Sequence, residues 1–171
     1  MNKILFILLI STQIQAQIFL GNTGKISFFS ETPIENITAV NDNVSAVFDA
    51  SNNNLVFQLS ITDFIFPNAL MQEHFNENYL ESDKYPNSTF SGIVTNLEND
   101  NATVEGKLTI HGITNKITAN GKFINNGDFI SIIANLSVRL DDYRIKIPTI
   151  VMYKIAENIK INIDIKLVSN K

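Results

Sequence analysis

The stretch IKINIDIKL, residues 159–167, decides the fold. Apolar side chains occupy every second position, and lysine, asparagine and aspartate occupy the positions between them. Side chains of a β-strand point alternately to the two faces of a sheet, so this spacing gives the strand one apolar and one polar face. The segment therefore predicts a half-buried strand with Ile161 and Ile163 on its inner face.

The same alternation recurs along the chain. It is clear at residues 55–62, 104–111, 117–123 and 130–138, and weaker around residues 26–30, 44–48 and 90–97. Polar clusters separate these segments, and one contains the Asn126-Gly127 pair, which suits a tight hairpin. Short strands that are apolar on one side only are typical of antiparallel sheets. We expect an all-β protein whose strands form the wall of a small antiparallel barrel, in one domain spanning residues 17–171.

One segment departs from the strand pattern. Asn68 can cap a helix from Ala69 to about Tyr79, because Leu70, Met71, His74 and Phe75 follow at helical spacing. A short helix between strands is expected near one end of the barrel. It could close a ligand cavity there or merely cover an apolar end, and both alternatives stay open.

The inward residues indicate whether the barrel is hollow. Several are small, namely Ala46, Gly106, Ala119, Gly121 and Ala134, and small inward side chains favour a cavity. The other inward residues are aliphatic or aromatic, among them Phe57, Phe123, Ile132, Leu136, Ile161 and Ile163. Such a cavity would select long apolar ligands. Glycines inside strands can instead mark the bends that close a barrel, so a filled core remains the alternative.

Composition excludes several classes of function. The formal net charge is −4 and the basic residues are scattered, which argues against nucleic-acid binding and against a polybasic membrane-binding surface. There is no cysteine, which excludes disulfides and thiolate chemistry. The two histidines, His74 and His111, have no acidic or histidine partner at the spacing of a metal site. No nucleophile motif or carboxylate pair stands out, so we expect neither an enzyme nor a metal protein.

The N-terminus predicts export. Lys3 precedes the apolar run Ile4 to Ile10 and a polar stretch that ends at Ala16, which is the layout of a secretory signal peptide in residues 1–16. This run is too short to span a bilayer, and no later apolar run is longer, so an integral membrane protein is not expected. The expected location is the periplasm or the outside of the cell.

Three stretches together resemble a known family. They are LMQEHF followed by ESDKYP (residues 70–75 and 81–86), TFSG (residues 89–92) and GKLTIHGIT (residues 106–114). In this order they are similar to the YceI-like family of bacterial exported proteins, and the similarity extends through LDDY and IKIP (residues 140–143 and 145–148). The resemblance implies a lipocalin-like antiparallel barrel that holds a polyisoprenoid or another long-chain lipid. It implies a binding protein without naming the lipid.

The leading hypothesis is therefore an exported protein that holds a polyisoprenoid or other long-chain amphiphile inside an apolar barrel, for carriage or storage. No cofactor is expected other than such a lipid, and the oligomeric state is left open, a homodimer included. The alternative is a non-catalytic structural or interaction barrel with a filled core. The residues predicted to contact lipid are Phe57, Leu70, His74, Phe75, Phe90, Ala119, Gly121, Ile132, Ala134, Leu136, Ile161 and Ile163.

Export can be tested on the protein recovered from the exported fraction of its host. The small side chain of Ala16 suits the position before the cleaved bond, so the chain should begin at Gln17. Intact-mass measurement checks this expectation. A mass that retains residues 1–16 would contradict it.

Overall fold

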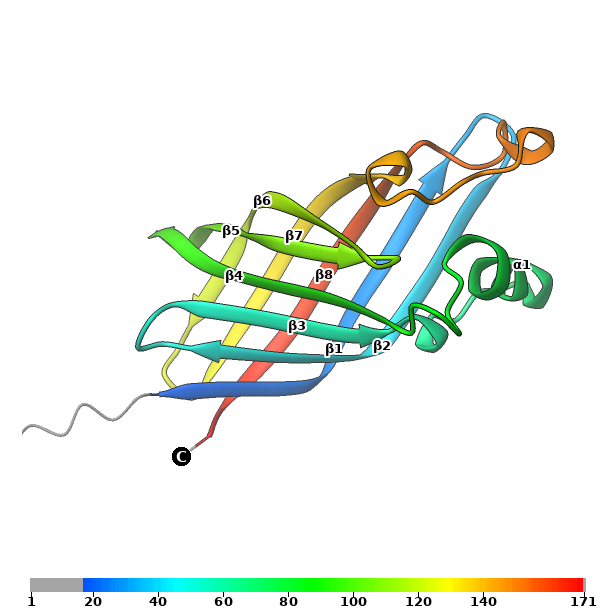
Figure 1. The fold of residues 1–171 in the computed structure, drawn as a ribbon. Coiled ribbons are helices and arrows are strands. Elements are labelled where there is room, and N and C mark those ends of the chain that lie inside the picture. The colour runs from blue at the N-terminus through cyan, green and yellow to red at the C-terminus, as the bar shows by residue number, and fades with distance from the viewer. Residues whose placement is uncertain (1–16, 171) are drawn as a thin grey trace, which may run out of the picture.

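Eight antiparallel strands close into a barrel in sequence order in the computed structural model, which describes residues 17–170 (Figure 1). The strands are β1 (Ile18–Glu31), β2 (Asn36–Asp49), β3 (Asn54–Ser60), β4 (Asn87–Glu98), β5 (Asn101–Ile110), β6 (Ile113–Asn125), β7 (Phe129–Arg139) and β8 (Asn158–Asn170). The expected antiparallel barrel is thus confirmed. The predicted signal peptide, residues 1–16, lies outside the described residues.

Strand β8 has the two faces that its sequence predicts. Ile159, Ile163, Ile165 and Leu167 are buried, Ile161 is half-buried, and the residues between them are exposed. The strand pairs with β7 on one side and with β1 on the other, and so closes the barrel. Two strands extend well beyond their expected ranges, residues 26–30 and 44–48: β1 and β2 each contain 14 residues.

One end of the barrel is filled by aromatic rings. Phe48 lies between Phe19 and Phe123, with ring centroids 6.3 and 4.9 Å away. Ile165 and Leu167 of β8 belong to the same packed end, and both are fully buried. We call these five residues the plug. It lies at the end where β1 begins and β8 ends, on the left of Figure 1.

At two places in the barrel, adjacent strands are hydrogen-bonded over only part of their length. β3 pairs with β2 only through residues 54–58, and the next part of the chain covers the gap: Ile65 bridges to Val40, and Asn41 Nδ2 donates to the Ser60 carbonyl at 2.8 Å. β6 pairs with β7 only from Gly121 to Asn125. No strand pairing joins residues 113–120 to residues 135–139, and we call this stretch the β6–β7 seam.

The predicted helix is present at the end opposite the plug. It comprises α1 (Ala69–His74) and one π-helical turn, η2 (Phe75–Tyr79). Asn68 caps it as expected, since its Oδ1 accepts from the amides of Leu70 and Met71 at 2.9 and 3.3 Å. Three short 3₁₀ turns complete the described chain: η1 (Ile61–Asp63), η3 (Leu140–Tyr143) and η4 (Thr149–Val151). Among the helices of residues 17–170, none has the length and apolar character needed to cross a membrane.

The plug predicts where the barrel is sensitive to truncation. Ile165→Ala should cost about 2–5 kcal/mol of unfolding free energy, because the side chain is fully buried against packed neighbours. Asp164→Ala, on the exposed face of the same strand, should change it by less than about 0.5 kcal/mol. Urea denaturation measures both, and equal losses would show that the assigned strand faces are wrong.

Candidate ligand-binding cavity

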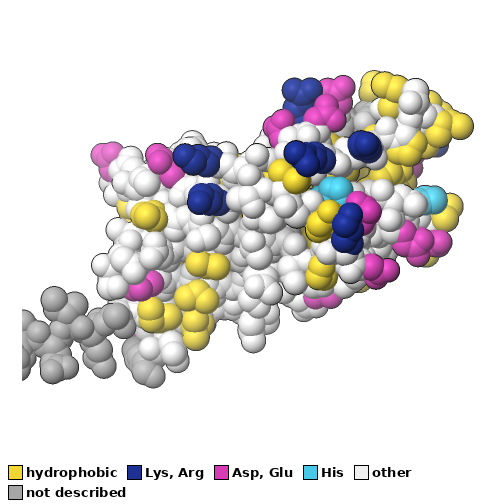
Figure 2. All heavy atoms as spheres, in the orientation of Figure 1, with side chains coloured by type: hydrophobic (Ala, Val, Ile, Leu, Met, Phe, Trp, Pro, Cys, Tyr) yellow, Lys and Arg dark blue, Asp and Glu magenta, His cyan; other side chains and the backbone are white. Residues whose placement is uncertain are grey.

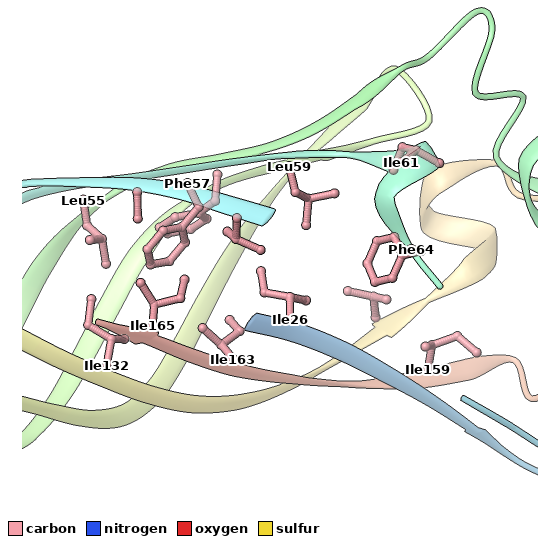
Figure 3. Close-up of a cluster of buried hydrophobic side chains, with 14 of the residues drawn as sticks. Ile26, Leu55, Phe57, Leu59, Ile61, Phe64, Ile132, Ile159, Ile163 and Ile165 are labelled. Carbon is pink, nitrogen blue, oxygen red and sulfur yellow. The ribbon is translucent and has the colours of Figure 1, made fainter. Parts of the chain in front are cut away.

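A cavity of about 210 Å³ occupies the barrel between the plug and the helix. Its wall is built by inward side chains from strands on all sides, and Figure 3 shows ten labelled examples converging on one interior. Nine of these line the cavity, whereas Ile165 lies in the plug. An engineered protein cavity of roughly 150 Å³ stays dry and binds benzene, so this space is large enough for part of an apolar ligand.

The lining is apolar and carries no formal charge. Its polar members are Ser30, Gln58, Tyr79, Ser88, Thr89 and Tyr143, and no lysine, arginine, aspartate, glutamate or histidine is among the lining residues. Burial raises the pKa of Tyr143, with a small opposing effect of the Asn115 amide. That amide donates instead to the Asp142 carbonyl at 2.7 Å, and no described group forms a hydrogen bond of good geometry with Tyr143 Oη. The phenol therefore stays neutral, and an ionic group on a ligand would find no partner inside.

Aromatic rings form the cavity wall beneath the helix. Phe75 of η2 stacks on Phe28 of β1 at 5.4 Å and packs against Phe64 and Phe66 at 5.6 and 4.9 Å. Phe64 and Phe66 alternate with exposed Ile65 in the segment that covers the gap between β2 and β3. One ring of the helix segment thus contacts three rings of the barrel wall.

Nine of the twelve predicted contact residues line the cavity: Phe57, Phe75, Phe90, Ala119, Ile132, Ala134, Leu136, Ile161 and Ile163. Their contact with a lipid stays a prediction, but the structure brings them together around one space.

Leu70 and His74 do not line it, contrary to the expected inner face of the helix. The inward residues are Met71, Phe75 and Tyr79, four positions apart, and this phase turns Leu70 and His74 toward solvent. His74 Nδ1 instead lies 2.9 Å from Asn78 Oδ1 on the helix surface.

Gly121 faces inward but does not line the cavity either. A Cβ atom there would lie 2.5 Å from the Ile133 carbonyl oxygen and 2.7 Å from Ala134 Cβ, so the glycine permits close approach of β6 and β7. Gly106 has a similar role, because the tip of the Phe90 ring occupies the space that a side chain would need. Of the five small inward residues, only Ala119 and Ala134 line the free space.

Sequence reasoning missed two groups of lining residues. Phe28, Phe64 and Phe66 come from β1 and from the segment after β3, and Ile145, Ile147 and Ile155 come from the long connection before β8. A signal was present, since Ile145 and Ile147 alternate with Arg144 and Lys146 as in a half-buried strand. The segment is nevertheless irregular in the structure, and its apolar residues Ile145 and Ile147 still line the cavity.

At the β6–β7 seam no strand pairing closes the cavity wall. Ile117, Ala119 and Leu136 line the cavity from its two sides, yet all three are only half-buried. Where β6 begins, η3 bridges the seam, because the Asn115 side chain of β6 donates to the Asp142 carbonyl.

His111 connects two irregular segments that we call the covers of the cavity: the helix segment, residues 69–81, and the connection that begins with η3. Its Nε2 lies 2.7 Å from Glu81 Oε2, just after the helix, and its Nδ1 lies 3.2 Å from the Tyr143 carbonyl oxygen of η3. The Tyr85 ring packs edge-on against the imidazole, with centroids 4.6 Å apart. Both atoms that face the imidazole nitrogens are hydrogen-bond acceptors.

His111 thus joins two segments that are distant in the sequence. The turn itself needs Gly112, whose φ is +71° and whose Cβ would collide with the Tyr85 ring. In residues 17–170, no group of three histidine, aspartate or glutamate side chains is placed to hold a metal ion.

Comparison with known proteins identifies the family of this chain and solved structures with the same fold. A family model described as a YceI-like domain matches residues 19–167. No curated protein is similar enough in sequence to count as a match. Similar solved structures include Burkholderia cenocepacia BcnA, with 16% identity, a TM-score of 0.74 and coverage of 84% of this chain and 95% of that chain.

Two further structures have the same fold. A polyisoprenoid binding domain from Saccharophagus degradans, implicated in plant cell wall breakdown, has 14% identity, a TM-score of 0.74 and coverage of 91% and 99%. The Campylobacter jejuni YceI protein has 18% identity, a TM-score of 0.62 and coverage of 99% and 94%. At these identities the likeness establishes a shared barrel fold and says nothing of the ligand.

The bond from His111 predicts an acid-dependent loss of stability. It is the main cause that lowers the pKa of Glu81 in the folded protein, with a smaller effect of Lys84. A lowered carboxyl pKa stabilises the fold above the unfolded pKa, and this contribution is lost as the pH falls through the folded pKa. Glu81→Gln should therefore be destabilised near neutral pH, and its difference from the wild type should shrink in acid.

Urea denaturation at a series of pH values measures this difference. Glu73→Gln removes the same charge from an exposed helix position and controls for net charge. Parallel stability curves for Glu81→Gln and the wild type would contradict the assigned role of the His111 bond.

Proposed function

Because this chain belongs to the YceI-like domain family, we propose that it is an exported lipid-binding protein that holds a polyisoprenoid or another long-chain amphiphile inside its barrel, for carriage or storage. One observation carries the proposal. The cavity is lined by aliphatic and aromatic side chains and by no charged residue, so it favours a hydrocarbon chain over any ionic or strongly polar ligand.

Energetics support a chain-like ligand. Each methylene moved from water into an apolar site contributes about 0.8 kcal/mol. About ten such carbons would supply about 8 kcal/mol before the entropic cost of association is subtracted, so affinity depends strongly on chain length. The name of the Saccharophagus degradans domain, which binds polyisoprenoid, agrees with a ligand of this class.

The head group of the ligand belongs outside the cavity or must be neutral. A diphosphate or carboxylate inside the barrel would lose its hydration without gaining a cationic partner, because the lining has none. We therefore place the hydrocarbon chain inside and any charged head group at the surface.

The filled structural barrel was the alternative. Its specific support is the plug, where Phe19, Phe48 and Phe123 leave the cavity no extension. The opposite half holds free space among buried apolar side chains, which favours binding over a filled core. The family and its polyisoprenoid-binding member likewise point to a binding protein rather than an enzyme.

Export completes the proposal. It is supported by Lys3, by the apolar run Ile4 to Ile10 and by Ala16. A long-chain lipid is poorly soluble in water, and a water-soluble barrel that encloses its chain would serve to carry or store it in the periplasm or outside the cell.

Filling the cavity should separate binding from stability. In Ala134→Phe, the added ring can occupy free space, so the melting temperature of the delipidated protein should hold while uptake of a fluorescent long-chain prenol falls strongly. Both quantities are measured on the same preparation.

Ala46→Phe is the matched control. Ala46 is buried near the plug and does not line the cavity, so its added ring should overpack the core and cost about 1–3 kcal/mol. Undiminished prenol uptake by a stable Ala134→Phe protein would contradict the assigned cavity. Absence of any long-chain lipid or prenol uptake in the wild type would contradict the proposed function itself.

A further inference from the structure

Four exposed large apolar side chains lie on two turns at the covered end of the cavity. They are Ile34 (62% exposed), Ile150 (78%), Met152 (58%) and Tyr153 (53%). Ile34 lies in the turn between β1 and β2, and the other three lie in or beside η4. We call these four residues the apolar tip. Figure 2 shows apolar side chains gathered on this end of the molecule, at the upper right.

Two contacts hold the parts of the tip together. Lys154 Nζ lies 3.6 Å from Glu35 Oε2, and the Ala156 amide donates to Ser30 Oγ at 2.8 Å. The β1–β2 turn is itself closed by Thr32, whose Oγ1 donates to the Glu35 carbonyl at 2.9 Å. The tip therefore consists of two tied turns that project beyond the barrel wall (Figure 1).

The tip is continuous with the cavity. Ile147 precedes η4 and Ile155 follows it, and both side chains line the cavity. One segment thus presents apolar side chains to the interior at both ends and to solvent at its middle. The exposed apolar residues of the tip and the apolar lining of the cavity are therefore joined in one short segment.

From this continuity we propose that the apolar tip docks onto the surface of a lipid bilayer, where the barrel exchanges its ligand. The inference rests on the proposed function for its purpose, but the docking itself does not. Isoleucine and methionine side chains can enter the boundary between head groups and acyl chains, and a tyrosine pairs an apolar ring with a polar hydroxyl suited to that boundary.

The shape of the tip favours a bilayer over a folded partner. Its exposed apolar residues stand on two turns that reach beyond the barrel wall, and such a projecting end can meet a flat bilayer surface. The connection between β7 and β8, which contains η4, carries charges of both signs. Arg144 and Lys146 are exposed there, and so are Asp141 and Glu157. Docking should therefore depend on apolar insertion and only weakly on salt.

A second apolar surface supplies a matched control. Val168, Leu20, Val47 and Val56 are cross-strand neighbours on the outer wall of β8, β1, β2 and β3, and all four are exposed. This row lies flat on the sheet near the plug, and none of its residues lines the cavity. It matches the tip in residue type without its projection or its continuity with the interior.

The experiment compares two double variants with the wild type. Ile150→Ser with Met152→Ser removes apolar area from the tip, and Leu20→Ser with Val168→Ser removes it from the wall. Flotation with vesicles of phosphatidylethanolamine and a minority of phosphatidylglycerol measures docking. The tip variant should bind about tenfold less than the wild type, and the wall variant should bind like the wild type. Melting curves confirm that each variant is folded.

Uptake of a fluorescent prenol separates docking from ligand binding. Delivered from preloaded vesicles, the prenol should enter the tip variant about tenfold more slowly, whereas its uptake from ethanol should be unchanged. If the wild type takes up no prenol but its flotation still depends on the tip, the proposed function fails and docking stands. Equal flotation of the tip variant and the wild type overturns docking. So does a wild type that does not float, or whose tip instead governs self-association in size-exclusion chromatography.

Discussion

The barrel depends on the aromatic plug that closes one end. Eight strands with inward apolar residues enclose a volume that must either be filled or be kept open by a rigid wall. Phe19, Phe48 and Phe123 fill that volume at one end, together with the fully buried Ile165 and Leu167 of β8. Each fully buried aromatic or branched side chain contributes about 1.5–3 kcal/mol. This packed end fixes the register of the strands, so the other half can retain free space that by itself stabilises nothing.

The two incomplete ladders are where the wall departs from a regular barrel. Between β2 and β3 the chain repairs the gap with its own next residues, and the repair delivers Phe64, Phe66 and the helix to the cavity. Between β6 and β7 no such segment follows the gap. There η3 bridges the two strands where β6 begins, through the hydrogen bond from Asn115 to the Asp142 carbonyl. The cavity is therefore thickly covered on the helix side and thinly covered at the seam. Ile117 and Leu136 line the cavity on the two sides of that unpaired stretch.

Local alternation made most of the fold predictable, whereas the site depended on phase and distance. In β8 every inward residue follows from its position in IKINIDIKL, because strand geometry alone decides the face. The helix range and its Asn68 cap also follow from local chemistry. The inner face of that helix did not, because its phase is set by where Phe75 meets Phe28, a residue from a distant strand. The inward direction of Gly121 was correct, but a neighbouring backbone fills its space, and no sequence pattern reports that approach.

The His111 bridge explains how the irregular covers keep their places. The helix side ends at Glu81 and the opposite cover begins with η3, and neither is joined to the other by strand pairing. One imidazole reaches both, through Glu81 Oε2 and the Tyr143 carbonyl, from the tight turn between β5 and β6. The bridge therefore ties the end of the helix segment to η3. The turn that carries His111 belongs to a fully paired hairpin, so the irregular segments at this end of the cavity are anchored to the regular barrel wall.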